Sequence, residues 1–374
     1  MPRAAPRRSL ALAAGLAFGL LALPSLAPPS LAQERVVNVY NWTDYIDPKV
    51  IERFTAETGI RVRYDMFDSL ETLEAKMSAG RSGYDVIAPT NEPTFSRLIA
   101  AGALQPLDYA KIPNAAGLDR TLMGRLRSSD PDNRHGVIYL WGTIGLGLNV
   151  ERIRALSRTV PLDSWDLLFR PENARAISRC GITIMDSQTD VIPTVLRYLG
   201  LSQDSTSTDD LRRVEQTLMA IRPSVRSFAS GGALEQLATG EACLALTYSG
   251  DVIQAQGRAA EANRGVTVTY VAPKEGAQLW FDVLAIPRDA PNAENAHAFI
   301  NFILKPENIA AITNAVHYPN AVPASKPFIE PEILADRNVY PTEEDFARFF
   351  TVSSVPQAAD RARNRTWARF KAGR

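Results

Sequence analysis

The first amphipathic pattern after the N-terminal region lies at residues 36–46, where β-branched residues alternate with polar ones. The sequence VVNVYNWTDYI indicates a buried strand that ends in a loop carrying two aromatic rings, a hydroxyl and a carboxylate. A helical pattern follows from Pro48 and stops at Gly59. Because ligands of α/β proteins gather at the carboxyl ends of strands, this loop is a candidate binding site. An apolar surface beside a fixed negative charge suits a cation with a hydrocarbon body.

Strand and helix patterns alternate along most of the remaining chain, which is typical of an α/β protein with a parallel sheet covered on both faces. Residues 111–134 are polar and irregular by pattern. Further strands are expected at 60–67, 84–88, 137–141, 144–149, 181–185, 242–248, 266–271 and 279–287. Helices are expected at 48–58, 70–80, 95–101, 191–199, 208–221, 233–238, 251–262, 292–304 and 306–315, and again from Thr342.

The first 32 residues differ from the rest of the chain. Three arginines in the first eight residues precede the apolar run Leu10–Leu23, and small residues around Ala32 form a cleavage site. The run is too short to span a membrane, so it predicts a signal peptide and export to the periplasm. Cleavage after Ala27 is the alternative. No cysteine follows the cleavage site, so no lipid anchor is expected there.

The length after this leader, about 340 residues, exceeds one ordinary core and predicts two lobes with a ligand cleft between them. The strands around residues 137–149 are expected to cross from one lobe to the other, and the apolar run Leu279–Pro287 to cross back. Lobe 1 is expected at 33–142 and 264–318, and lobe 2 at 143–263 and 319–374.

Charge and cysteine content narrow the functional classes. Basic and acidic residues balance at 41 each, so no global field favours nucleic acid. Cys180 and Cys243 are most simply a disulfide in an exported protein, and two separate buried thiols are the alternative. The three histidines His135, His297 and His317 lack metal-ligand spacing, so no metal is expected.

Five carboxylates follow or interrupt apolar strands: Asp44, Glu92, Asp190, Asp251 and Asp282. Helix capping is the alternative for Asp190 and Asp251, because each directly precedes a predicted helix. Asp282 lies inside an apolar run, where a charge is costly unless it is paired.

Aromatic residues accompany three of these carboxylates, although each ring alone could be an ordinary core residue. Together the two residue types fit a flexible diamine or triamine, since carboxylates bind ammonium groups and aromatic faces stack on methylenes. The aromatic residues concerned are Trp42, Tyr45, Tyr248, Trp280 and Phe281.

Catalytic signatures are missing from the sequence. It has no G-x-S-x-G, no H-E-x-x-H, no glycine-rich phosphate loop and no histidine near a candidate nucleophile. We therefore expect neither an enzyme nor a cofactor. An extracytoplasmic enzyme using paired carboxylates on an amine or sugar is the alternative. A receptor for an iron chelate or an amino acid is a third hypothesis, for which no tyrosine pair or facing arginine can be placed.

Seven short segments are distinctive when they occur together. The segments are YNWTDYI at 40–46, ETGIRV at 57–62, YDMFDS at 64–69, DSWD at 163–166, SGDV at 249–252, PKEGA at 273–277 and FDV at 281–283. Through them the chain resembles the periplasmic polyamine-binding proteins of ATP-dependent (ABC) importers, and is most similar to their putrescine-binding branch. The resemblance implies a two-lobed periplasmic-binding-protein fold of type II with a closing hinge. It also implies a polyamine ligand, an ABC permease in the inner membrane as partner, and a monomer.

The resemblance also implies ligand-binding positions and a Cys180–Cys243 disulfide. Trp280 is larger than the phenylalanine frequent in putrescine binders, Thr43 replaces serine, and Glu92 adds a charge. These departures would suit spermidine as well as, or better than, putrescine. The implied ligand-binding residues are Trp42, Thr43, Asp44, Tyr45, Thr90, Asp190, Tyr248, Asp251, Trp280, Asp282 and Tyr318, and Glu92 is included as an additional carboxylate near the pocket.

Overall fold

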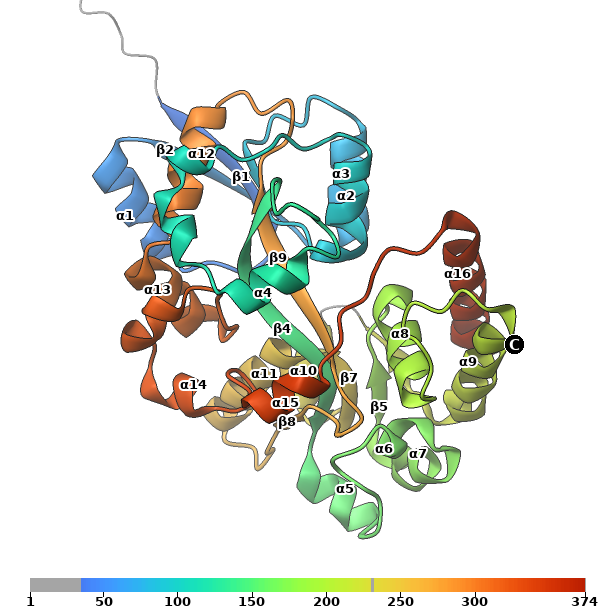
Figure 1. The fold of residues 1–374 in the computed structure, drawn as a ribbon. Coiled ribbons are helices and arrows are strands. Elements are labelled where there is room, and N and C mark those ends of the chain that lie inside the picture. The colour runs from blue at the N-terminus through green and yellow to red at the C-terminus, as the bar shows by residue number, and fades with distance from the viewer. Residues whose placement is uncertain (1–34, 230–231, 374) are drawn as a thin grey trace, which may run out of the picture. The chain divides into compact units, whose positions relative to one another are not determined.

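A computed structural model describes residues 35–229 and 232–373. The predicted signal peptide lies outside these residues. Within them, no helix has both the length and the apolar character needed to cross a membrane. The expected α/β architecture is confirmed, with nine strands joined in one sheet (Figure 1).

The sheet is mixed, which corrects the expectation of a parallel sheet. Its order is β2-β1-β3-β9-β4-β7-β5-β6, and β8 pairs with β4. The β1 strand runs parallel to β2 and β3, and β5 runs parallel to β6 and β7, but β9 is antiparallel to both β3 and β4. The strands are β1 Val36–Trp42, β2 Arg61–Phe67, β3 Val86–Ile87, β4 Gly136–Leu148, β5 Ile182–Ile184, β6 Ser227–Phe228, β7 Leu244–Tyr248, β8 Thr269–Val271 and β9 Gln278–Ala285.

Strand β4 is one continuous buried strand, although the sequence predicted two strands separated by Gly142 and Thr143. Gly142 serves packing and not a turn. A Cβ at this position would lie 2.5 Å from Cζ2 of Trp280 on β9. The glycine therefore lets a large ring of the neighbouring strand approach the backbone.

Most predicted helices form, with shifts at their ends. Residues 111–134, predicted to be irregular, contain α4, whose N-cap Asp119 accepts from two backbone amides. Helix α8 begins at Gln188 after Ser187, so Asp190 lies in its first turn and is not the cap. The helices are α1 Pro48–Thr58, α2 Leu70–Ser78, α3 Ser96–Ala100, α4 Arg120–Leu126, α5 Val150–Leu156, α6 Asp166–Phe169, α7 Pro171–Ile177, α8 Gln188–Tyr198, α9 Thr208–Ile221, α10 Gly232–Ala238, α11 Ser249–Ala262, α12 Ala293–Ile303, α13 Pro306–Val316, α14 Pro331–Ala335, α15 Glu343–Arg348 and α16 Gln357–Ala372.

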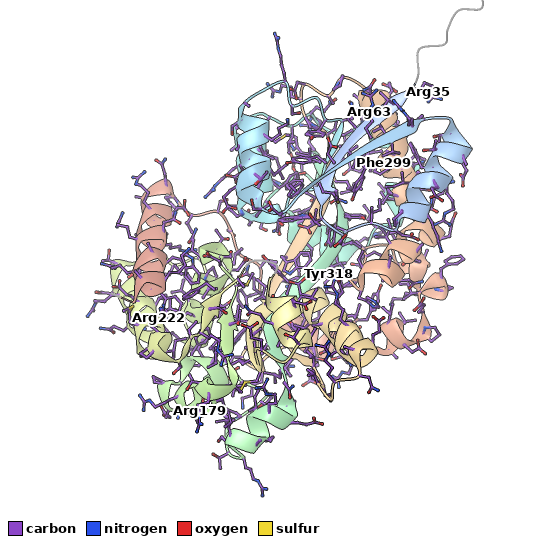
Figure 2. The ribbon with its side chains drawn as sticks, turned by 180° about the vertical axis from the view of Figure 1, so that it is seen from behind. Arg35, Arg63, Arg179, Arg222, Phe299 and Tyr318 are labelled. Carbon is purple, nitrogen blue, oxygen red and sulfur yellow. A yellow bond between two sulfur atoms is a disulfide. The ribbon has the colours of Figure 1, made fainter. Side chains whose placement is uncertain are left out.

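The helices gather in two groups along the sheet (Figure 1). One group, with α1, α2, α3 and α12, lies around β2, β1 and β3, where Phe54 of α1 meets Phe299 of α12 edge-on at 5.2 Å. The other group, with α8, α9 and α16, lies beside β5. Figure 2 shows Tyr318 between the first group, marked by Phe299, and the second, marked by Arg179 and Arg222. The strands β4 and β9 connect the two groups.

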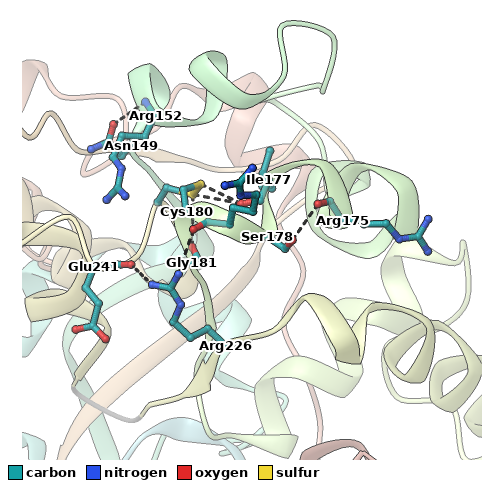
Figure 3. The surroundings of a disulfide bond; sticks show 11 residues. Asn149, Arg152, Arg175, Ile177, Ser178, Cys180, Gly181, Arg226 and Glu241 are labelled. Atoms are coloured by element: carbon teal, nitrogen blue, oxygen red, sulfur yellow. Dashed lines mark hydrogen bonds between the residues drawn. A yellow bond between two sulfur atoms is a disulfide. The ribbon is translucent and has the colours of Figure 1, made fainter.

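The expected Cys180–Cys243 disulfide is present (Figure 3). It joins the turn before β5 to the residue before β7, with the two Cα atoms 5.5 Å apart, an ordinary separation for a disulfide. Both cysteines are buried. The bond therefore fastens two neighbouring parallel strands at their start.

Candidate functional site

Asp282 lies in the middle of the sheet on β9 and is only 4% exposed. Its Oδ1 accepts a hydrogen bond of 2.6 Å from the Thr90 hydroxyl. The Tyr45 hydroxyl and the Trp42 indole nitrogen are buried nearby and help to lower the pKa of Asp282, although neither makes a hydrogen bond of normal geometry. Burial is the larger effect and raises the pKa of Asp282 to about 7.

Asp251 lies in the first turn of α11, at the end of β7. Its carboxylate accepts from the Tyr318 hydroxyl at 3.2 Å and from the Thr247 hydroxyl at 3.4 Å. These donors lower its pKa, but burial outweighs them and raises the pKa of Asp251 to about 6. Helix α11 therefore positions the Asp251 carboxylate beside Tyr318, which follows α13.

Asp190 is the third buried carboxylate, in the first turn of α8. It accepts hydrogen bonds from Ser187 at 2.6 Å, from Gln278 at 2.7 Å and from Tyr248 at 3.2 Å. Burial again raises its pKa. For all three carboxylates, the groups that shift the pKa include no lysine, arginine or histidine. Three buried acids therefore lie together with hydroxyl and amide donors, and no lysine, arginine or histidine in the described part of the chain forms an ion pair with them.

Four aromatic rings connect these carboxylates. Tyr45 meets Tyr318 at 5.5 Å between ring centroids, Tyr318 meets Trp280 at 5.2 Å, and Trp280 meets Tyr248 at 5.7 Å, each edge to face. Tyr248 feels the charge of Asp190, Asp251 and Asp282, all of which raise its pKa along with burial. We call the three carboxylates and four rings the aromatic–acidic cluster.

Two glycines make this arrangement possible. A Cβ on Gly250, in the first turn of α11, would lie 2.2 Å from Cζ of Tyr318. Gly142 likewise leaves room for Trp280, because a Cβ on Gly142 would collide with that ring. The role of these glycines was not predicted, because it depends on a ring from a distant segment.

Five of the twelve expected site residues are not part of the cluster. Thr90 and Trp42 lie next to Asp282, whereas the other three lie farther from it. Thr43 and Asp44 are exposed, and the backbone amide and hydroxyl of Thr43 both bond to the carbonyl of Phe67. Asp44 adopts a left-handed φ of 52°. Glu92 is buried, but its Oε2 accepts from Ser96 at 2.7 Å and from Ser354, away from the cluster.

Three hydrogen-bond donors to these carboxylates were also not predicted from the sequence. Ser187 and Gln278 donate to Asp190, and Thr247 donates to Asp251. Two of them had a local signal, since Ser187 lies three residues before Asp190 and Thr247 four residues before Asp251. Polar residues at such spacing commonly bond to a nearby carboxylate. Gln278 carries no comparable signal, because it reaches Asp190 from another strand.

A cavity of about 550 Å³ lies beside the cluster, between α2 and α3 on one side and α8 and α16 on the other. Ser187 lines the cavity and also donates to Asp190, so the cavity borders the cluster. Acidic side chains outnumber basic ones on its walls. They are Glu71, Glu74, Asp186 and Asp360, against Arg97 and Lys371. No three metal-ligating side chains of the described residues are placed to hold a metal ion.

The chain is similar to known binding proteins along nearly its whole length. It is 45% identical over 344 residues to the putrescine-binding periplasmic protein SpuD of Pseudomonas aeruginosa, covering 92% of this chain and 94% of the relative. It is 40% identical over 362 residues to the putrescine-binding periplasmic protein PotF of Escherichia coli, covering 96% and 97%.

The fold agrees with a solved structure as well. The spermidine/putrescine ABC transporter substrate-binding protein PotD of Streptococcus pneumoniae superposes with a TM-score of 0.78 at 27% identity, over 91% of this chain and 99% of the other. The fold is therefore of the periplasmic-binding-protein type. Residues 49–340 match the family model of bacterial extracellular solute-binding proteins. The chain belongs to the family of bacterial extracellular solute-binding proteins.

Proposed function

We propose that this protein captures a polyamine, putrescine or spermidine, outside the cytoplasm and delivers it to an ABC transporter. The observation that carries the proposal is the aromatic–acidic cluster, in which three buried carboxylates have no cationic partner among residues 35–229 and 232–373. Ammonium groups of a ligand would supply the missing positive charge. The names of the relatives support the same ligand class. The relatives are binding proteins, so the alternative of an enzyme lacks support.

The cluster suggests a role for each end of the ligand. Asp282, with Thr90, Trp42 and Tyr45 around it, would hold one ammonium group. Asp251, with Tyr318, would hold the other group of putrescine. The methylenes between them would lie against the aromatic faces, where each cation–π contact contributes roughly 1–2 kcal/mol when desolvated.

A longer ligand would use the remaining acids. Asp190, with Tyr248, would receive the additional ammonium group of spermidine. Thr43, Asp44 and Glu92 would line the outer part of the site and not the cluster itself. This division keeps all twelve sequence-predicted residues as candidates while assigning direct ammonium contacts to only three carboxylates.

Delivery would require the chain to close around its ligand. We propose that lobe 1 (33–142 and 264–318) and lobe 2 (143–263 and 319–374) move about the connecting strands β4 and β9. The closed form would present one surface to a permease in the inner membrane. We further propose that the mature protein is a periplasmic monomer that begins after Ala32.

Calorimetric titration of the purified mature protein tests the proposal. Putrescine, spermidine and butylamine are compared, since butylamine keeps the four-carbon chain and loses one ammonium group. We expect micromolar or tighter binding of a polyamine, which corresponds to about 8 kcal/mol, and binding of butylamine weaker by roughly tenfold or more. Absence of binding by both polyamines would contradict the function. Equal affinity for butylamine and putrescine would contradict the use of paired carboxylates.

A further inference from the structure

Residues 351–363, which comprise the stretch before α16 and its first two turns, are fastened to the α8–α9 side of the molecule. The Gln203 side chain donates to the carbonyl of Thr351 at 3.0 Å, and the amide of Ser353 donates to Asp204 at 2.9 Å. Gln188 of α8 donates to Asp360 at 3.2 Å. This segment therefore belongs structurally to the group of α8, α9 and α16.

The same segment also contacts the group of β3 and α3. The Ser354 hydroxyl bonds to the buried Glu92 carboxylate and lies 2.7 Å from the Ser96 hydroxyl. Asp360 forms an ion pair of 3.2 Å with Arg97 of α3. We call these contacts, Ser354 with Glu92 and Ser96 and Asp360 with Arg97, the latch. Arg97 and Asp360 both line the 550 Å³ cavity that borders the cluster, so the latch stands at the edge of that cavity.

The chemistry of Glu92 gives the latch its strength. Glu92 is 7% exposed, its Oε1 has no hydrogen-bond partner, and both hydroxyls that serve Oε2 come from serines. Because a buried carboxylate is costly when a donor is removed, separating Ser354 from Glu92 without letting in water is unfavourable. Separation of the two groups of elements at this contact must therefore either break the hydrogen bond between Ser354 and the Glu92 carboxylate or let water replace it.

We propose that the latch holds the two groups of elements in the arrangement of this structure, in which the three carboxylates are buried, and thereby slows release of a bound ligand. Arg97, Asp360 and Ser354 are then positioning residues, which act on the ligand through closure without touching it, and Glu92 accepts the contact from Ser354. The effect on release rests on the proposed polyamine function. The effect on closure does not depend on which ligand the cluster takes.

Release is measured by stopped-flow fluorescence, as the rate at which putrescine leaves a protein challenged with excess competitor. Arg97→Ala and Asp360→Asn should each raise the dissociation rate about two- to fivefold, the range for a partly exposed ion pair. The double variant should do no more than either single change, because both remove the same ion pair between the two groups, whereas the other partners of Arg97 and Asp360, Glu74 and Gln188, each lie within one group. Ser354→Ala should raise the rate roughly tenfold, since it removes a donor from a buried carboxylate. Association rates should change little.

Arg369→Ala is the matched control. Arg369 pairs with Glu215 of α9, so this ion pair also uses α16 but stays within one group of elements. It should leave the dissociation rate unchanged. Wild-type rates in Arg97→Ala, Asp360→Asn and Ser354→Ala, or an equal increase in Arg369→Ala, would overturn the latch.

A ligand-independent readout separates this proposal from the polyamine function. Spin labels at Lys76→Cys on α2 and Arg365→Cys on α16 report the distance between the two groups, because both positions are exposed and the native cysteines are paired. Latch variants should give a longer or broader distance distribution than the wild-type sequence, and Arg369→Ala should not. If polyamines fail to bind, the function is wrong while these distances still decide the latch. Unchanged distances in every latch variant would overturn it.

Discussion

Three carboxylates are buried in the centre of this protein at a considerable electrostatic cost. Asp282 is the clearest case, since it is 4% exposed, its hydrogen-bond donors are neutral, and the nearby Asp190 raises its pKa in addition to burial. A charge in such a place is unfavourable unless a partner arrives. We interpret this desolvation of the carboxylates as the reason why the site would favour a cation. The attraction between an ammonium group and a buried carboxylate is stronger than the same attraction in water.

Replacing Asp282 by asparagine should separate binding from folding. The amide keeps the size of the side chain and removes the charge, so polyamine affinity should fall at least about 30-fold, the lower range for loss of one partner of a buried charge pair. Calorimetric titration measures the loss. Asp163→Asn, an exposed carboxylate paired only with Lys274, is the control and should bind normally. Normal affinity in Asp282→Asn would contradict the assigned contact.

The pH dependence of stability should show the same carboxylate. The pKa of Asp282 rises from 3.8 to about 7 in the fold, so between these values the folded chain holds a proton that the unfolded chain has released. Its contribution to stability is complete below about pH 4 and is lost as the pH rises to 7, by up to about 1.4 kcal/mol per unit. In ligand-free Asp282→Asn, urea unfolding at pH 5 and pH 8 should lack this decrease. An identical pH profile in both proteins would contradict the burial of a titrating Asp282.

Ligand binding should also release protons near neutral pH. Asp282, with a pKa of about 7, and Asp251, with a pKa of about 6, are partly protonated before binding, and an ammonium neighbour favours their ionised forms. Calorimetry in buffers of different ionisation enthalpy measures this release. We expect more release at pH 6 than at pH 8, where both groups are already ionised. Release that does not vary with pH would count against these two residues.

Side-chain placement explains why sequence reasoning succeeds for some of these residues and not for others. Asp282 could be singled out because a charge inside an apolar strand needs a partner, and the structure gives it Thr90. Asp44 and Glu92 occupy similar positions at strand ends, yet one is exposed and the other turns to Ser354. The position along a strand does not fix the direction of the next side chain, which tertiary contacts decide.

At the scale of single elements, α11 offers a matched pair of glycines. A Cβ on Gly250 would collide with Tyr318, whereas a Cβ on Gly257 meets nothing within 4 Å. Gly250→Ala should therefore displace the Tyr318 ring and weaken polyamine binding by roughly tenfold or more, as overpacking of about 1–3 kcal/mol implies. Gly257→Ala should bind normally and gain about 0.4–1 kcal/mol of stability. Equal affinity of the two variants would show that the Tyr318 position is unimportant.

The disulfide should stabilise the sheet without taking part in binding. It closes a loop with a sequence separation of 63, which predicts about 4 kcal/mol on the chain-entropy model. The Cys180→Ser, Cys243→Ser double variant should lose this amount in urea unfolding, and reduced wild-type protein should match it. The double variant, where it is folded, should still bind the polyamine. A loss below about 1 kcal/mol would show that the disulfide restrains the unfolded chain much less than the chain-entropy model predicts.

Local patterns predicted elements well where the determinants were themselves local. Helix α1 has an Asp47 cap and ends at a left-handed Gly59, and α9 buries one stripe of apolar residues, so both match their predicted ranges. Strand β4 was split in the prediction because Gly142 resembles a turn residue when the ring of Trp280 is unknown. The antiparallel direction of β9 could not be predicted either, since an apolar run indicates burial but does not identify the neighbouring strand.

For the whole described molecule, the two groups of helices share one sheet through β4 and β9. The aromatic–acidic cluster lies where these long strands meet residues of both groups, with Asp282 from β9, Tyr45 from the loop before α1 and Asp190 from α8. A ligand that neutralises the cluster should therefore stabilise the whole fold. At a concentration 100 times its Kd, putrescine should add about 2.7 kcal/mol to the free energy of unfolding. An unchanged unfolding midpoint would contradict binding to the folded state.

A crystal structure of the mature protein with putrescine tests the central claim most directly. The account predicts one ammonium nitrogen within hydrogen-bonding distance of Asp282 and the other within reach of Asp251, with the methylenes against Trp280 and Tyr318. A ligand that lies elsewhere, or an ammonium group that contacts neither carboxylate, would contradict it.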